Sequence, residues 1–193
     1  ICLWMRHPIT IERPLLGLLA LRGFFLILAT YCFVAAIAVM PIADALAIVF
    51  VEPFILLVMG KWLFNEQVGR RRISASVIGF SGVLLVIQPS FSVFGLVALF
   101  PLGTALAFAF YMLVTRRLSR QMEPVPMQLH TATLATAMCL PVLLWGHLSD
   151  HPTLSPLLAP VMPQGIAWLW LLGVGIFASL SHMLITCALR FAP

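Results

Sequence analysis

The chain has 193 residues, of which 62% are hydrophobic and 9% are charged, and its formal net charge is +5. A water-soluble domain carries roughly 25% charged residues, so this composition excludes an ordinary soluble protein, and its hydrophobicity excludes a disordered one. The cysteines stand singly within apolar runs, at Cys2, Cys32, Cys139 and Cys187. This spacing argues against a disulfide framework or a zinc site. We therefore expect a membrane protein with no metal site and no cofactor.

The predicted elements are apolar runs long enough to cross a bilayer, whose core of about 30 Å needs about 20 residues of helix. Charged residues and prolines divide the chain into six such spans, at 22–40, 42–60, 73–88, 94–114, 126–147 and 166–189. Residues 1–5 have the character of the tail of another helix. The sequence therefore predicts an all-α fold, a polytopic transmembrane helix bundle. Because it lacks an initial Met and ends just after a span, we expect a piece of a longer protein.

The basic residues predict the direction of the spans, because cytoplasmic loops are enriched in Lys and Arg. They precede the first span, separate the second from the third, follow the fourth and end the sixth: Arg6, Arg13 and Arg22; Lys61, Arg70, Arg71 and Arg72; Arg116, Arg117 and Arg120; Arg190. The alternate loops contain none. This pattern predicts that the basic loops are cytoplasmic and that the first span runs outward. The positive charge thus reports orientation in a lipid bilayer and gives no reason to expect a nucleic-acid partner.

Tryptophans are expected near the membrane interfaces. Trp4 and Trp62 fall near the basic ends of the spans, and Trp145, Trp168 and Trp170 fall near the opposite ends. This distribution agrees with the orientation that the basic residues predict.

Two carboxylates remain in apolar surroundings, Asp44 and Glu52, both in the second span. An acidic group at membrane depth costs about 2.5–3.5 kcal/mol even on insertion scales, so each is a candidate functional residue. Asp44 follows the outer turn at Pro41 closely, and capping of the helix explains it as well as a binding role does. Glu52 comes roughly 12 Å deeper along a helix, near the midplane. In a continuous helix its side chain would lie within about 80° of Asp44.

The residue after Glu52 is Pro53, which cannot donate a hydrogen bond to the carbonyl of Val49. We therefore expect the helix to kink or open beside the carboxylate, as in transporters that build substrate and ion sites from broken helices. The alternative is a protonated Glu52 that bonds to a neighbouring helix and serves only packing.

Weaker candidates lie in other spans. His182 and Thr186 share a helix face, and His182 suits a proton relay or a simple helix-to-helix hydrogen bond equally well. Tyr31 and Tyr111 are candidates for lining a cavity, although such side chains more often serve interhelical packing.

The sequence Gly79-Phe80-Ser81-Gly82 matches the G-x-S-G pattern of rhomboid-type intramembrane serine proteases, with His182 as a conceivable base. That chemistry needs Ser and His within hydrogen-bond reach and an oxyanion site. Packing explains the glycines more simply, because Ala75, Gly79 and Gly82 form a stripe of small residues that admits another backbone. We therefore assign no catalytic residue and expect that the chain is not an enzyme.

Motifs in a fixed order resemble the EamA type of the drug/metabolite transporter superfamily. In the first half they are Met40-Pro41-Ile42-Ala43-Asp44-Ala45, Glu52-Pro53, Asn65-Glu66, Val68-Gly69-Arg70-Arg71, Gly79-Phe80-Ser81-Gly82-Val83-Leu84-Leu85 and Gln88-Pro89. In the second half they run from Gly95 through Ala105 to Tyr111, Thr115-Arg116-Arg117 and Ala188-Leu189-Arg190-Phe191-Ala192-Pro193. The family usually has Gly where Asn65 stands.

An internal repeat accompanies the resemblance. At one constant offset, Leu19 pairs with Leu171, Gly23 with Gly175, Phe25 with Phe177, Leu28 with Leu180, Ala36 with Ala188 and Pro41 with Pro193. The basic residues predict opposite directions for these two spans, which is typical of an inverted repeat. On the ten-helix, five-plus-five template of the family, residues 1–92 resemble the latter part of the first EamA repeat, with the end of helix two and helices three to five. Residues 93–193 resemble the first part of the second repeat, helices six to eight, so that helices one, nine and ten are not represented.

The resemblance implies a permease of the bacterial inner membrane that carries small organic solutes by alternating access, proton-coupled or facilitated. The sequence Phe50-Val51-Glu52-Pro53 is most similar to the branch for S-adenosylmethionine uptake, and riboflavin carriers are the other option. We expect Glu52 to be the cation or proton site, with Asp44 near the outer mouth and His182, Tyr111 and Tyr31 as lining residues. The intramembrane protease and a membrane scaffold that transports nothing are the alternative functions.

Overall fold

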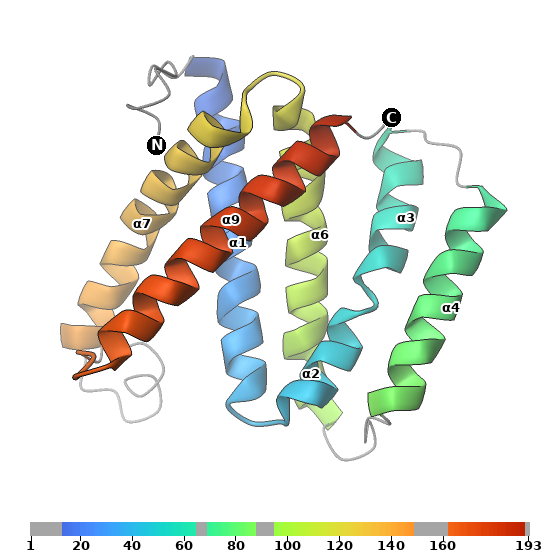
Figure 1. Cartoon of the computed structure of the whole chain (residues 1–193), viewed down its shortest axis with the longest axis horizontal. Coiled ribbons are helices and arrows are strands. Elements are labelled where there is room, and N and C mark those ends of the chain that lie inside the picture. Colours follow the sequence, from blue (N-terminus) through green and yellow to red (C-terminus); the bar gives the residue numbers. More distant parts are fainter. Residues whose placement is uncertain (1–12, 65–68, 88–94, 149–161, 192–193) are drawn as a thin grey trace. The chain divides into compact units, whose positions relative to one another are not determined.

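The computed structural model describes residues 13–64, 69–87, 95–148 and 162–191, and every regular element in these ranges is helical (Figure 1). The helices are α1 (Arg13–Ile37), α2 (Ile42–Val49), α3 (Glu52–Phe64), α4 (Arg70–Ile87), the 3-10 turn η1 (Gly95–Ala98), α6 (Leu99–Ser119), α7 (Pro124–Leu148) and α9 (Ala167–Phe191). The prediction of an all-α, polytopic helix bundle is confirmed.

Among the described residues, five segments are long and apolar enough to cross a membrane: Pro14–Ile37, Ile42–Trp62, Gly95–Ser119, Pro124–Gly146 and Ala167–Phe191. The sequence predicted six spans. The difference lies at α4, whose first turn carries Arg70, Arg71 and Arg72 and leaves too short an apolar stretch within its described length. The first span also begins at Pro14 and not at residue 22, so Arg22 lies inside a span and not before it.

The chain forms two compact units, which are described separately. Unit 1 comprises Ile1–Phe24 and Val114–Pro193, and unit 2 comprises Phe25–Leu113. Unit 1 therefore holds the start of α1, the end of α6, α7 and α9. Unit 2 holds the rest of α1 and α6 together with α2, α3 and α4.

In unit 2, small side chains bring α1 and α6 close together. A Cβ atom added at Gly103 would lie 3.4 Å from the Cys32 sulfur, which is tight van der Waals contact. The Thr104 hydroxyl donates a hydrogen bond to the Ala29 carbonyl of α1 at 3.4 Å. The rings of Phe25 and Phe110 stack with their centroids 4.9 Å apart. These contacts replace lipid contact with tight helix packing, which is how small residues stabilise helix pairs in a bilayer.

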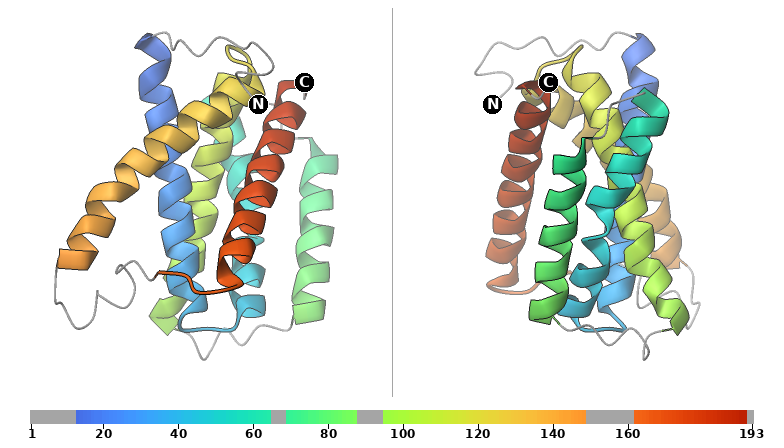
Figure 2. Two further views of the ribbon diagram at one scale, coloured as in Figure 1. Left: turned by 60° about the vertical axis from the view of Figure 1, so that its left-hand side comes forward. Right: turned by 90° about the vertical axis from the view of Figure 1, so that its right-hand side faces the viewer.

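Helix α2 packs against α1 and α4, and α3 packs against α4. Ala36, Met40, Ala45 and Ile48 form a buried apolar cluster where α1 turns into α2. Helices α3 and α4 lie side by side (Figures 1 and 2), and the rings of Phe54 and Phe80 meet edge to face at 5.6 Å.

The small-residue stripe of α4 does not act as the sequence predicted. Ala75, Gly79 and Gly82 are exposed, and a Cβ atom added at either glycine would meet nothing within 4 Å. The packed side of the helix carries Phe80 instead. No backbone of the described residues approaches the stripe.

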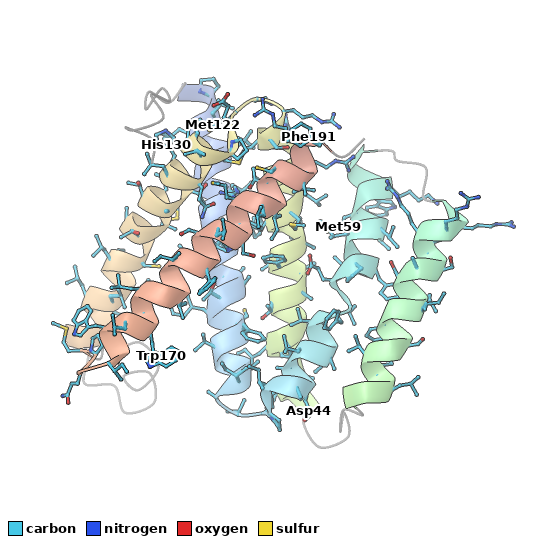
Figure 3. The ribbon with its side chains drawn as sticks, in the orientation of Figure 1. Asp44, Met59, Met122, His130, Trp170 and Phe191 are labelled. Carbon is cyan, nitrogen blue, oxygen red and sulfur yellow. The ribbon has the colours of Figure 1, made fainter. Side chains whose placement is uncertain are left out.

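In unit 1, a buried apolar cluster lies among α1, α6 and α7. Leu15, Leu19, Leu118 and Met127 are its buried members. Helices α7 and α9 also contact each other. Met122 and Phe191 lie at one end of this unit and Trp170 lies at the other (Figure 3). The tryptophans of α7 and α9 are exposed, with Trp145 59% and Trp168 54% accessible, as interfacial side chains are expected to be.

Candidate functional site

The second span is broken at its centre. Helix α2 ends at Val49 and α3 begins at Glu52. Between them the Val51 amide donates to the Ile48 carbonyl, three residues back, at 3.1 Å, and the Phe54 amide donates to the Val51 carbonyl at 3.0 Å. Because Pro53 has no N–H, the Val49 carbonyl cannot receive its usual helical hydrogen bond. The break therefore presents backbone oxygen at the middle of a membrane span.

Glu52 is the first residue of α3 and lies at the midpoint of the Ile42–Trp62 span. Its side chain is half-buried, and within the described part of the chain its carboxylate makes no hydrogen bond or ion pair. The N-terminus of α3 favours a negative charge at this position, while the C-terminal carbonyls of α2 carry partial negative charge. The carboxylate can bind a proton, and carboxylate and carbonyl oxygens together can coordinate a cation.

Asp44 lies in the first turn of α2 and is half-buried. Pro41 occupies the N-cap, and no side chain makes a capping hydrogen bond there. Asp44 therefore is not the cap, although the helix dipole still favours its charge. The expected common face of Asp44 and Glu52 assumed one continuous helix, and the turn residues Phe50 and Val51 interrupt that helix.

The other predicted residues fall in both units. Tyr111 is fully buried in α6 and stacks on Phe108 with ring centroids 5.3 Å apart, and Tyr31 is half-buried in α1. Both belong to unit 2, together with Asp44 and Glu52. His182 is half-buried in α9 and belongs to unit 1, where its backbone carbonyl accepts a hydrogen bond from the Thr186 hydroxyl at 2.8 Å. The structure thus places four of the five in one unit and His182 in the other.

Arg22 was predicted to precede the first span, but it lies inside that span. Its side chain is fully buried in unit 1. Its Nε donates to the Thr115 hydroxyl at 2.9 Å and its Nη1 to the Thr131 hydroxyl at 2.5 Å. Its Nη2 donates to the Gln128 side-chain oxygen at 3.4 Å and to the Thr186 hydroxyl at 3.5 Å. These side chains form hydrogen bonds with the guanidinium in place of water. Helix α1 can therefore continue past Arg22, where the sequence analysis had placed the start of the span.

A local signal for this burial was present. The residues from Pro14 to Leu21 are apolar and continue directly into the run after Arg22. The threonines that surround Arg22 come from three other spans, and their convergence requires the fold. A charged residue within a membrane span is a candidate functional residue by default.

Within the described ranges, no three His, Cys, Asp or Glu side chains gather closely enough to hold a metal ion. The described cysteines, Cys32, Cys139 and Cys187, are free thiols.

The long apolar helices and the intramembrane carboxylate define a multi-pass helical membrane protein. Residues 1–88 match the EamA-like transporter family. This match and the relatives described below support the EamA type within the drug/metabolite transporter superfamily, in agreement with the motifs.

Curated relatives carry transporter names. A riboflavin transporter of Vibrio cholerae is 30% identical over 89% of this chain and 54% of the relative. A pseudopaline exporter of Pseudomonas aeruginosa is 25% identical over 97% of this chain and 63% of the relative. An S-adenosylmethionine uptake transporter of Rickettsia prowazekii is 21% identical over 71% of this chain and 46% of the relative. The chain therefore spans roughly half the length of these proteins.

No solved structure matches the chain significantly. The relatives are named as transporters or exporters and the family is a transporter family, which agrees with the expectation that the chain is not an enzyme. Nothing in these comparisons supports the rhomboid-type protease reading of Ser81 and His182.

Proposed function

We propose that the protein to which this chain belongs moves a small organic metabolite across the bacterial inner membrane by alternating access. The observation that carries the proposal is the broken second span, which holds Glu52 at its midpoint beside the Val49 carbonyl. Broken helices with an ionisable group at mid-depth are a common way to build transport sites, because the exposed backbone and side-chain oxygens replace the hydration of the cargo.

In this proposal Glu52 binds a coupled proton or a cationic group of the cargo. A carboxylate exchanges a proton more easily when, like Glu52, it is not tied to a fixed donor. Asp44 lies nearer the end of the same span and serves the outer mouth, with the basic loops on the cytoplasmic side. Tyr31 and Tyr111 of the same unit are the lining residues. His182 serves either a proton relay or packing.

Riboflavin is the first substrate to test, because relatives that are 30% and 33% identical are named riboflavin transporters, and S-adenosylmethionine is the second. The experiment is uptake of each radiolabelled compound by membrane vesicles that contain the full-length gene product. Vesicles without it give the background. Uptake of either compound above this background supports transport. If uptake of both compounds equals the background, the result favours the scaffold alternative.

The same vesicles test the site. Glu52→Gln removes the charge and keeps the shape, and Glu123→Gln does the same at an exposed position in the turn between α6 and α7. We expect Glu52→Gln to lower uptake at least tenfold and Glu123→Gln to leave it within twofold of the unchanged protein. Equal loss in both variants would contradict a special role for Glu52.

A further inference from the structure

Arg22 connects the four described helices that contribute to unit 1. Its guanidinium lies in α1 and donates to Thr115 of α6, to Thr131 and Gln128 of α7, and to Thr186 of α9. We name these five residues the Arg22 collar. Arg22 and the three threonines of the collar are almost completely inaccessible to solvent. A single side chain thus holds together four segments that are distant in the sequence.

The threonine hydroxyls are oriented to accept from Arg22. The Thr131 hydroxyl donates its own proton to the Met127 carbonyl at 2.8 Å, and the Thr186 hydroxyl donates to the His182 carbonyl at 2.8 Å. Each hydroxyl has one proton and two lone pairs. Because the proton is used within the helix, the lone pairs face the guanidinium, and the collar is built around a cation.

The four contacts differ in length. The bonds to Thr115 and Thr131 are 2.9 and 2.5 Å long, whereas the bond to Thr186 is 3.5 Å long, at the limit of a hydrogen bond. Helix α7 also approaches α1 closely, since a Cβ atom added at Gly23 would lie 3.6 Å from the Thr131 carbonyl and the Ala135 amide nitrogen. Helices α1, α6 and α7 are therefore joined firmly, and α9 is joined by the longest bond.

Helix α9 contacts α7, but few of its side chains are buried. Of its 25 residues, Thr186 is the one that is fully buried in the described structure. Apolar side chains along its length stay exposed, among them Leu172 at 62%, Ile176 at 65% and Phe177 at 73%. Between two apolar surfaces in lipid there is no hydrophobic driving force, so packing and polar contacts decide whether α9 stays in place.

We propose that Arg22 is a positioning residue that latches α9 to the α1–α6–α7 core of unit 1 through Thr186. When the Arg22–Thr186 hydrogen bond breaks, α9 moves away from the core while the shorter bonds keep α1, α6 and α7 together. The latch would release α9 during alternating access, and in that respect the inference rests on the proposed function. The release itself is measurable without any substrate.

The test is hydrogen–deuterium exchange of the full-length protein in lipid nanodiscs, read by mass spectrometry for α9 and α7 separately. Thr186→Val removes the hydroxyl and keeps the shape. The matched control is Thr133→Val on α7, because Thr133 is exposed and its hydroxyl bonds only to its own helix, to Leu129 at 2.9 Å. Thr186→Ser restores the hydroxyl.

We expect Thr186→Val to raise exchange in the C-terminal half of α9 by roughly threefold to tenfold, the range expected for one intramembrane hydrogen bond. Exchange in α7 stays unchanged, Thr133→Val changes neither helix, and Thr186→Ser returns α9 to the original rate.

Unchanged exchange in α9 would overturn the latch. A parallel rise in α7 and α9 with a lower melting temperature would overturn it too, because it would make Thr186 a general anchor of the fold. Uptake by membrane vesicles is a separate experiment, so absence of transport by the unchanged protein would refute the proposed function and leave the exchange result standing.

Discussion

Of the four collar contacts, Thr131 accepts the shortest hydrogen bond from the Arg22 guanidinium, so Thr131→Val tests whether the collar stabilises unit 1. Valine keeps the branched shape and removes the acceptor, which leaves a fully buried guanidinium N–H with one bond fewer. An unsatisfied buried donor costs about 1–3 kcal/mol in soluble proteins, and double-mutant cycles in membranes give about 0.6 kcal/mol on average and about 1.7 at most. Because the bond is short and its donor charged, we expect a loss of about 1–2 kcal/mol in the free energy of unfolding.

The assay is equilibrium unfolding of the detergent-solubilised protein by SDS, followed by tryptophan fluorescence. Thr133→Val is the matched control, because it removes a hydroxyl from the exposed side of the same helix. We expect the control to change the free energy of unfolding by less than about 0.5 kcal/mol, as surface substitutions usually do. If Thr131→Val and Thr133→Val gave equal free energies of unfolding, the collar would not stabilise the unit and the reasoning would be refuted.

Three further substitutions test other parts of the structure. Pro53→Ala restores an amide that can donate to the Val49 carbonyl, so the break should close. We expect the free energy of unfolding to rise by about 1–3 kcal/mol and uptake to fall at least tenfold. Undiminished uptake would show that transport does not need the break. Gly79→Ala should raise the free energy of unfolding by about 0.8–1.0 kcal/mol, because the added Cβ meets nothing within 4 Å, and a loss would reveal a helix packed on that face. Gly23→Leu should lower the free energy of unfolding by about 1–3 kcal/mol, because the larger side chain would clash with α7. Gly23→Ala should be tolerated, because its Cβ atom would lie at ordinary contact distance from Ala135. Equal stability of the two variants would contradict the close approach of α1 and α7.

Most of the spans could be predicted from the sequence, because a long apolar run can be recognised as a membrane span from its local hydropathy alone. The exception at α4 follows from its three arginines, and the exception at α1 has a different physical cause. Hydropathy counts Arg22 as a barrier, but the cost of its charge depends on Thr115, Thr131 and Thr186, which lie far away in the sequence. A local pattern carries no information on whether such acceptors converge, so the start of the first span was placed too late.

The candidate site shows the same limit within a single span. Pro53 marks a place where a helix loses a donor, and the structure has its break there, between Val49 and Glu52. The predicted angle between Asp44 and Glu52 assumed one continuous helix, and the structure has two helices there. The grouping of Tyr31 and Tyr111 with Glu52 in one unit, and of His182 in the other, also depends on long-range packing.

The central claim is that Glu52, at the break of the second span, takes part in transport. The most direct measurement is uptake of riboflavin, or of S-adenosylmethionine if riboflavin is not taken up, by vesicles with and without an inward proton gradient, compared between the unchanged protein and Glu52→Gln. We predict uptake by the unchanged protein and at least a tenfold lower rate for Glu52→Gln, with any stimulation by the gradient lost in the variant. Equal uptake by both proteins under both conditions would contradict the claim.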